Sequence, residues 1–188
     1  RYGNRKIGDV GGHLPPFGLA CIAAYIRKQS FSVKIIDALA DNLTVDDILE
    51  DIKKLQPKVI GFSAMTPQFF RAVELANDIS KHFSNSLVVI GGHHASILSE
   101  NTLKENSCFD LLVYGEGENT ALEIMEKYKE TNWNKHNFLK DINSLRNISG
   151  MAFRDNNYNI ILNKPREQIK DLDVLPRPAW DLLPMHKY

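Results

Sequence analysis

The sequence is poor in the features that mark metal-cluster, nucleic-acid-binding or membrane proteins. It has only two cysteines, Cys21 and Cys108, which lie too far apart for a zinc or iron–sulfur motif and are expected to be small buried apolar residues. Its 23 basic residues are balanced by 23 acidic ones, which argues against binding to nucleic acid or an anionic membrane through overall charge. No apolar run approaches the roughly 18 residues of a membrane-spanning helix. We therefore expect a cytoplasmic protein with no nucleic-acid partner and no membrane span.

What is present suits one folded domain with a short appendage. A chain of 188 residues, of which 43% are hydrophobic and 24% charged, can bury one substantial core. The chain begins at Arg1 instead of Met and ends just after a Pro-rich stretch. These ends predict that the sequence is a piece of a longer protein.

Short apolar runs alternate with longer segments of helical periodicity. The runs at 33–37, 59–63, 87–90 and 111–114 are expected to be strands. In the segment after Pro67, Phe70, Val73, Ile79 and Phe83 are expected to face inward from a long helix. Apolar strands that alternate with helices are typical of a parallel sheet covered on both faces. The pattern predicts an α/β fold with a doubly wound parallel sheet in a domain spanning residues 1–132.

Residues 133–188 are expected to form a connection and a smaller unit. The polar segment 133–147 has no clear period and is predicted to be irregular. Two β-prone segments, 150–154 and 158–162, are separated by turn-forming Asp155, Asn156 and Asn157, which predicts a small C-terminal β-hairpin. Residues 165–184 contain four prolines and are predicted to be a linker laid over the surface.

In a doubly wound sheet, the loops that follow the strands meet at the carboxyl edge, where ligands bind. One such loop, Gly91 to Ser96, reads GGHHAS. The glycine pair could allow a cofactor to approach the backbone, or it could serve a tight turn with positive φ. A metal site would need further ligands at HxH or HxxxH spacing, which the sequence lacks.

Two further loops at this edge carry polar side chains. Ser63 and Thr66 could bond to phosphate or amide groups, although Thr66 could instead cap the following helix. Glu116 and Glu118 could be an acid–base pair, or they could be stabilised by a helix dipole. The sequence has neither a Gly-x-Ser-x-Gly nor a Walker phosphate loop, and Gly115-Glu116-Gly117 lacks the third glycine of a dinucleotide fingerprint. We therefore assign no catalytic residue.

Taken together, five motifs resemble the N-terminal cobalamin-binding domain of radical SAM enzymes, in particular the magnesium-protoporphyrin monomethyl ester oxidative cyclase group. They are Pro15-Pro16-Phe17-Gly18-Leu19, Val33-Lys34-Ile35-Ile36-Asp37-Ala38, Gly61-Phe62-Ser63, Gly91-Gly92-His93-His94-Ala95-Ser96 and Tyr114-Gly115-Glu116-Gly117-Glu118. The segment 171–180 resembles the entry of these proteins into the radical SAM barrel. The resemblance thus covers nearly the whole chain.

The resemblance implies a flavodoxin-like, cobalamin-binding Rossmann-like fold that holds cobalamin with its nucleotide tail in the sheet edge. Ser63-Ala64-Met65 resembles the Ser-x-Leu element of the cobalamin-binding pattern, and Gly91-Gly92 resembles its Gly-Gly element. The implied cofactor-binding residues are Gly18, Ser63, Met65, Thr66, Gly91, Gly92, His93, His94, Tyr114, Gly115, Glu116 and Gly117. No protein metal ligand is assigned.

The sequence departs from the family in two places. Asp9, His13 and Gly18 do not have the spacing of the Asp-x-His-x-x-Gly motif that ligates cobalt from below. The family also begins with an apolar strand, whereas only residues 1–10 precede the Pro-Pro loop here. We expect that Lys6 to Val10 occupy part of the place of this first strand, or that a neighbouring chain does, and that the cobalamin affinity suffers.

The leading hypothesis is a cobalamin-binding module that presents the corrin to a downstream radical SAM domain, for methyl transfer or another radical reaction. The iron–sulfur cluster and S-adenosylmethionine are expected only in that downstream domain, and the fragment is expected to be inactive alone. The alternative is an α/β enzyme or regulator that binds a phosphorylated small molecule at the same edge, with Glu116 or His94 assisting chemistry. A third interpretation is a docking domain that has lost its ligand.

Overall fold

The computed structural model describes residues 14–188 as a five-stranded sheet with helices on both faces. The strands are β1 (Val59–Ser63), β2 (Leu87–Gly91), β3 (Leu111–Val113), β4 (Met151–Arg154) and β5 (Ile160–Leu162). They lie in the order β1-β2-β3-β4-β5. β1, β2 and β3 are parallel, whereas β4 and β5 form an antiparallel hairpin that extends the same sheet through β3. The predicted parallel α/β sheet and the predicted hairpin are thus confirmed.

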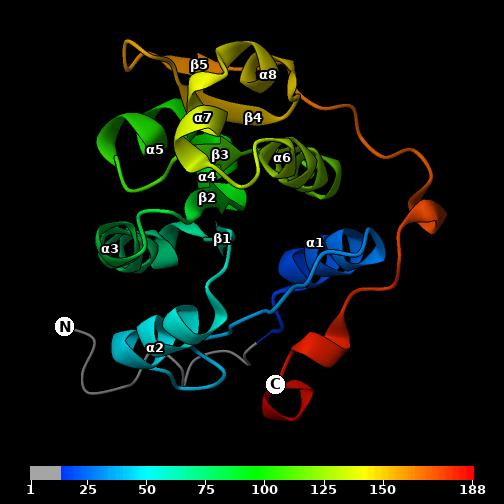
Figure 1. Cartoon of the computed structure of the whole chain (residues 1–188). Coiled ribbons are helices and arrows are strands. Elements are labelled where there is room, and N and C mark those ends of the chain that lie inside the picture. Colours follow the sequence, from blue (N-terminus) through cyan, green and yellow to red (C-terminus); the bar gives the residue numbers. More distant parts are fainter. Residues whose placement is uncertain (1–13) are drawn as a thin grey trace.

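The longer helices connect or flank the parallel strands (Figure 1). They are α1 (Phe17–Lys28), α2 (Val45–Leu55), α3 (Thr66–His82) and α6 (Glu118–Glu130). α2 begins with a capping box in which the Thr44 hydroxyl accepts from the Asp47 N–H, and the Asp47 carboxylate accepts from the Thr44 N–H. Such reciprocal bonds satisfy two of the free N–H groups at the helix start, which is why α2 begins where it does.

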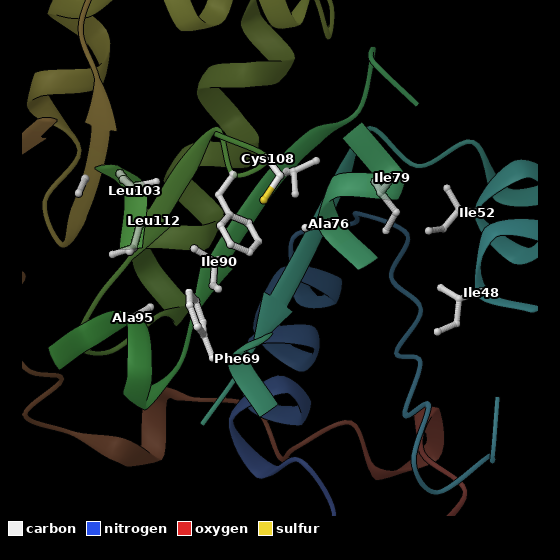
Figure 2. Close-up of a cluster of buried hydrophobic side chains, with 13 residues drawn as sticks. Ile48, Ile52, Phe69, Ala76, Ile79, Ile90, Ala95, Leu103, Cys108 and Leu112 are labelled. Atoms are coloured by element: carbon white, nitrogen blue, oxygen red, sulfur yellow. The ribbon is translucent and has the colours of Figure 1, made fainter. Parts of the chain in front are cut away.

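One face of the sheet packs against α2 and α3, together with the short helices α4 (His93–Ile97) and α5 (Ser99–Glu105). Val88, Ile90 and Leu112 point to this side, where Figure 2 shows Ile79 of α3 facing the isoleucines of α2. Within α3, Phe69 is buried while Phe70 is 75% exposed. The prediction that Phe70 faces inward is therefore wrong, because the helix begins at Thr66 and its phase places Phe69 against the core.

The other face packs against α6 and two more short helices, α7 (Lys135–Lys140) and α8 (Ile142–Asn147). Leu111 and Val113 point to this side and meet Ile124 and Tyr128 of α6. The prediction that residues 133–147 are irregular is wrong. Asn134 and Asp141 accept bonds from the backbone at Asn137 and Ser144, and these caps start helices too short to show a period.

The segment 33–37 is extended but pairs with no strand within residues 14–188, so the prediction of a strand there is wrong for the part of the chain that the structure describes. Its side chains nevertheless alternate between two faces. Val33 and Ile35 pack on the side of α1, whereas Ile36 packs with the core on the side of α2. The expectation that Lys6 to Val10 or a neighbouring chain replaces a first strand concerns residues outside those described.

Three short 3₁₀ turns, η2 (Leu172–Val174), η3 (Trp180–Leu182) and η4 (Met185–Lys187), are the regular structure that follows β5. We call residues 165–188 the strap. In Figure 1 the strap, coloured orange to red, runs from the hairpin past α6 toward α1.

Candidate functional site

The structure brings three predicted site loops together at the carboxyl edge of the parallel strands. The loop after β1 bonds to the loop after β2 in both directions: the Ala64 N–H donates to the Gly91 oxygen at 3.3 Å, and the His94 N–H donates to the Ala64 oxygen at 3.2 Å. The Ser96 hydroxyl accepts from the Gly115 N–H at 3.2 Å, which joins the loop after β2 to the loop after β3. This juxtaposition follows from the parallel direction of β1, β2 and β3.

Gly92 is required by close backbone packing. Its φ is +92°, and a Cβ at this position would lie 2.9 Å from both the nitrogen and the oxygen of Ala64. Gly91 is less confined, since its Cβ would lie 3.4 Å from the nearest atom, the Val113 oxygen. The positive-φ turn interpretation thus accounts for Gly92, and the small residues allow the loops after β1 and β2 to meet.

The two adjacent histidines have different surroundings. His94 is only 8% exposed and stacks on Phe69, with ring centroids 3.8 Å apart. Its Nδ1 lies 3.2 Å from the Thr66 hydroxyl. His93 is exposed at the start of α4. His94 therefore packs α4 on α3, and His93 is the imidazole that faces outward at this edge.

Tyr114 and Glu116 are both engaged by the C-terminal part of the chain. The Tyr114 hydroxyl donates to the Asn163 oxygen, and burial raises the pKa of this phenol. One carboxylate oxygen of Glu116 accepts from the Ile169 N–H at 2.8 Å. Glu118 begins α6, where the helix dipole stabilises an acid. Each carboxylate therefore has a structural role that is an alternative to the acid–base role considered for Glu116 and Glu118.

The remaining predicted glycines divide into open and confined positions. Gly115 has φ +73° and no atom within 4 Å of the place of a Cβ. Gly18, on the first turn of α1, also has no atom within 4 Å of the place of its own Cβ. Gly117 is buried, and its Cβ would lie 2.8 Å from the Ile22 side chain. Gly117 thus lets α1 pack on α6, whereas Gly115 and Gly18 leave free space at the surface.

The other predicted residues, Ser63, Met65 and Thr66, are exposed at the end of β1 and directly after it. Thr66 is the first residue of α3 and not its N-cap, which is Met65, and its hydroxyl contacts His94 instead. The predicted helix-capping role of Thr66 is therefore wrong, since the helix begins one residue earlier than the pattern indicates.

Sequence reasoning missed the contacts of two residues, Ser96 at this edge and Asp37 in the loop 37–41. Ser96 joins two loops through its hydroxyl, and its place in the GGHHAS motif was the one available signal. Asp37 accepts from the N–H groups of Leu39 and Ala40 and from the hydroxyl of Tyr188, which lies 151 residues away in the sequence. No local pattern indicates such a distant partner.

The residues at this edge fit the cofactor that the resemblance implies. Cobalamin is a largely uncharged, amide-bearing group with one phosphate, and the edge offers the exposed hydroxyl-bearing residues Ser63 and Thr66 and open space at Gly115. No group of three or more His, Cys, Asp or Glu side chains that could hold a metal ion occurs within residues 14–188. Over the same residues, no helix combines the length and the apolar character needed to cross a membrane.

Comparison with known proteins gives a family and a set of relatives. The B12 binding domain family matches residues 6–125. An uncharacterised methyltransferase of Pyrococcus horikoshii is 36% identical over 184 residues, covering 98% of this chain and 37% of that protein. The anaerobic magnesium-protoporphyrin IX monomethyl ester cyclase of Rubrivivax gelatinosus is 29% identical over 182 residues, covering 96% of this chain and 31% of that protein. The chain thus spans about a third of the length of these curated relatives.

The fold is also similar to that of a solved enzyme. OxsB, a cobalamin-dependent S-adenosylmethionine radical enzyme solved with aqua-cobalamin and S-adenosylmethionine bound, superposes with a TM-score of 0.72 at 21% identity. The similarity covers 89% of this chain and 22% of OxsB and confirms the Rossmann-like fold. With the family match over residues 6–125, these findings confirm the resemblance, and the chain belongs to the B12-binding domain family, among relatives that include magnesium-protoporphyrin cyclases and cobalamin-dependent radical SAM methyltransferases.

Proposed function

We propose that this domain holds cobalamin at the carboxyl edge of β1, β2 and β3 and, in a longer protein, presents the corrin to a radical SAM domain. The observation that carries the proposal is the convergence of the loops after these strands, with open space beside Gly115 and the exposed residues Ser63 and Thr66 at the end of β1 and after it. When bound, cobalamin supplies a cobalt centre that can carry and give up a one-carbon group. The iron–sulfur cluster and S-adenosylmethionine would belong to the other domain.

The side chains at this edge have distinct proposed roles. Ser63 and Thr66 would donate to the phosphate and the side-chain amides of the cofactor, because both residues are exposed beside the loop after β2 and carry hydroxyl donors. Met65 is 54% exposed and would pack against an apolar surface of the bound group. His93 would contribute an exposed ring at the same edge.

The reaction itself would need the rest of the protein. Within this domain we propose no side chain for acid, base or nucleophilic chemistry, since His94 is stacked on Phe69 and Glu116 accepts from the Ile169 N–H. These are the two side chains that a phosphate-binding enzyme at this edge would use. We therefore propose methyl transfer or another radical reaction only for the complete protein, and binding alone for this domain.

Titration with hydroxocobalamin tests the proposal. Protein retained after gel filtration should carry corrin with a shifted absorption spectrum. Ser63→Ala should raise the Kd for hydroxocobalamin about threefold to tenfold, because a hydrogen bond to the cofactor is lost. Ser84→Ala is the matched control, since Ser84 precedes β2 at the opposite edge of the sheet.

Two results would contradict the proposal. One is a folded chain that retains no corrin. The other is a thermal shift produced by nucleotides or sugar phosphates and not by hydroxocobalamin, which would favour a phosphorylated small molecule as the ligand.

A further inference from the structure

The strap is fastened to the domain at three successive places. The first lies beside the loop after β3. Arg166 donates to the Thr120 hydroxyl at 2.8 Å and forms an ion pair with Glu123, and both partners belong to α6. Three residues later, the Ile169 N–H donates to Glu116 at 2.8 Å. Where it leaves the hairpin, the strap is therefore held against one of the proposed cofactor-binding loops.

The second place is α1. Ala179 is fully buried, and its N–H donates to the Ala20 oxygen at 3.0 Å. Arg27 donates to both carboxylate oxygens of Asp181, at 2.6 and 3.0 Å. The rings of Phe17 and Trp180 lie 5.9 Å apart at the start of the same helix. The strap thus covers a face of α1 over most of its length.

The third place is the loop 37–41. Lys187 pairs with Asp41 at 2.8 Å, and the Tyr188 hydroxyl donates to one oxygen of Asp37 at 2.8 Å. The other oxygen of Asp37 accepts from the N–H groups of Leu39 and Ala40. Desolvation and the Asp37 carboxylate raise the pKa of Tyr188, so its hydroxyl remains a donor at neutral pH. One carboxylate therefore shapes the loop and holds the end of the strap.

These contacts add to the packing of α1 and of the loop 37–41, in which Ala38 already contacts the core. The segment that joins them pairs with no strand within residues 14–188. α1 also packs on Val33 and Ile35. On α6, Tyr25 of α1 donates to Asn119 at 2.6 Å, and Ile22 packs against Gly117. The strap joins α1, the loop 37–41 and the loop after β3 to one another.

We propose that the strap is a positioning element of the cofactor-binding edge, and that Asp37, Asp41 and Glu116 act by holding the strap and not by touching a ligand. The effect on cobalamin rests on the function proposed above. The contacts predict that the bonds of Lys187 and Tyr188 hold the loop 37–41 and the end of the strap together, and that the strap, held in this way and bonded to Glu116, favours binding at the edge.

The test compares a strap-end variant, Lys187→Met with Tyr188→Phe, with the unaltered chain. Amide exchange in residues 37–43 should become about fivefold to tenfold faster, and the Kd for hydroxocobalamin should rise by a similar factor, while the midpoint of thermal unfolding of the whole domain stays unchanged. The matched control, Lys140→Met with Tyr158→Phe, removes the same groups from exposed positions outside the strap and should change neither value. Lys187→Arg with Tyr188 retained should restore both values, because it keeps the charge beside Asp41.

The outcomes separate this proposal from the proposed function. Unchanged exchange in residues 37–43 overturns the holding role of the strap, and faster exchange with unchanged affinity overturns its positioning role. If the unaltered chain binds no hydroxocobalamin, the proposed function fails, and the exchange comparison still decides whether the strap holds the loop.

Discussion

Gly92 and His94 show that two residues of one motif can be required for packing while their neighbours face the ligand edge. Gly92 combines a φ of +92° with a backbone contact that leaves no room for a Cβ. His94 fills a buried place between Phe69 and Thr66. Gly91 ends β2, and His93, which lies between Gly92 and His94, is exposed. Gly92 and His94 of the motif therefore pack the loops at the edge, whereas the His93 side chain faces outward.

Replacing Gly92 with Ala should destabilise the domain strongly. The added Cβ would meet the Ala64 backbone at 2.9 Å, and Ala adopts positive φ only with strain, so the free energy of unfolding should fall by about 2 to 4 kcal/mol. Urea unfolding measures this loss. Gly61→Ala is the matched control, since no atom lies within 4 Å of its Cβ position, and it should change the free energy by no more than about 1 kcal/mol. Equal effects at both positions would contradict the packing role of Gly92.

Substitution of the two histidines by Ala should change the free energy of unfolding by very different amounts. His94→Ala leaves a cavity beside Phe69 and should lower the free energy of unfolding by about 2 to 3 kcal/mol. His93→Ala should change it by less than about 0.5 kcal/mol, because the side chain is exposed. If the proposed function holds, His93→Ala should still weaken hydroxocobalamin binding. Paired urea unfolding and corrin titrations check both residues, and a stability loss confined to His93→Ala would refute the assignment.

At the scale of elements, a buried ion pair fastens α7 to the beginning of β3. Lys135 lies 2.7 Å from Asp110, whose side chain is 15% exposed. The Asp110 carboxylate also accepts from the Val88 N–H at 2.7 Å, which links it to β2. Burial raises the pKa of Asp110, although Lys135 and the Val88 N–H oppose the rise. Lys135 is therefore the main charge that keeps this carboxylate ionised inside the protein.

Replacing Lys135 with Met should destabilise the domain in a pH-dependent way. At about pH 7 the unpaired carboxylate should lower the free energy of unfolding by about 2 to 4 kcal/mol. The folded-state pKa of Asp110 then lies still further above its unfolded value, so its contribution to stability is fully present below the unfolded pKa and is lost as the pH rises through the folded pKa. The deficit relative to the unaltered chain should therefore shrink as the pH falls toward about 4.

Urea unfolding at several pH values measures this dependence. Lys127→Met, which breaks an exposed pair with Glu130 on α6, is the control and should have a small effect at every pH. A deficit that grows on acidification would show that burial does not dominate the pKa of Asp110.

The elements that could be predicted are those whose signal is local. The apolar runs of β1, β2 and β3 and the turn between β4 and β5 indicate strands directly, and Thr44 with Asp47 indicates the start of α2. The segment 33–37 has the same apolar character, yet it is a strand only if a partner lies beside it, which local sequence cannot specify. The short helices α7 and α8 have too few turns for a period, and their caps at Asn134 and Asp141 were the available signal.

The candidate site could be predicted as a place more readily than as a set of contacts. The parallel sheet implies that the loops at 63–66, 91–96 and 115–118 meet, and the structure brings them together. Which side chains turn inward depends on packing with distant residues. His94 is buried by Phe69, and Glu116 is engaged by Ile169 from 53 positions further along the chain.

At the scale of the whole molecule, β1 is the edge strand of the described sheet and pairs with β2 alone within residues 14–188. We predict that a further strand pairs with its outer edge, supplied by Lys6 to Val10 or by a neighbouring chain. The side chains of 33–37 alternate between the core on the side of α2 and the separate cluster beside α1, as side chains of an extended segment do.

Amide exchange tests this prediction. If Lys6 to Val10 pair with β1, its outward amides should be protected at least about tenfold over exposed amides at every protein concentration. If a neighbouring chain pairs with β1, the protection should rise with protein concentration. The amides of β2, which has a neighbour on each side, are the internal reference. Unprotected β1 amides at all concentrations would refute both sources of the strand.

The order of the strap contacts has a mechanical consequence. A pull on Tyr188 loads the bonds to Asp37 and Asp41 first, then the contacts of Ala179 and Asp181 with α1. The Ile169 bond to Glu116 follows, and the bonds of Arg166 to α6 are loaded last. Contacts that are loaded one after another break at low force. β4 is bonded along its length to β3 and β5, so several bonds must break at once before it can detach. Tension would therefore detach the strap stepwise and leave the sheet intact.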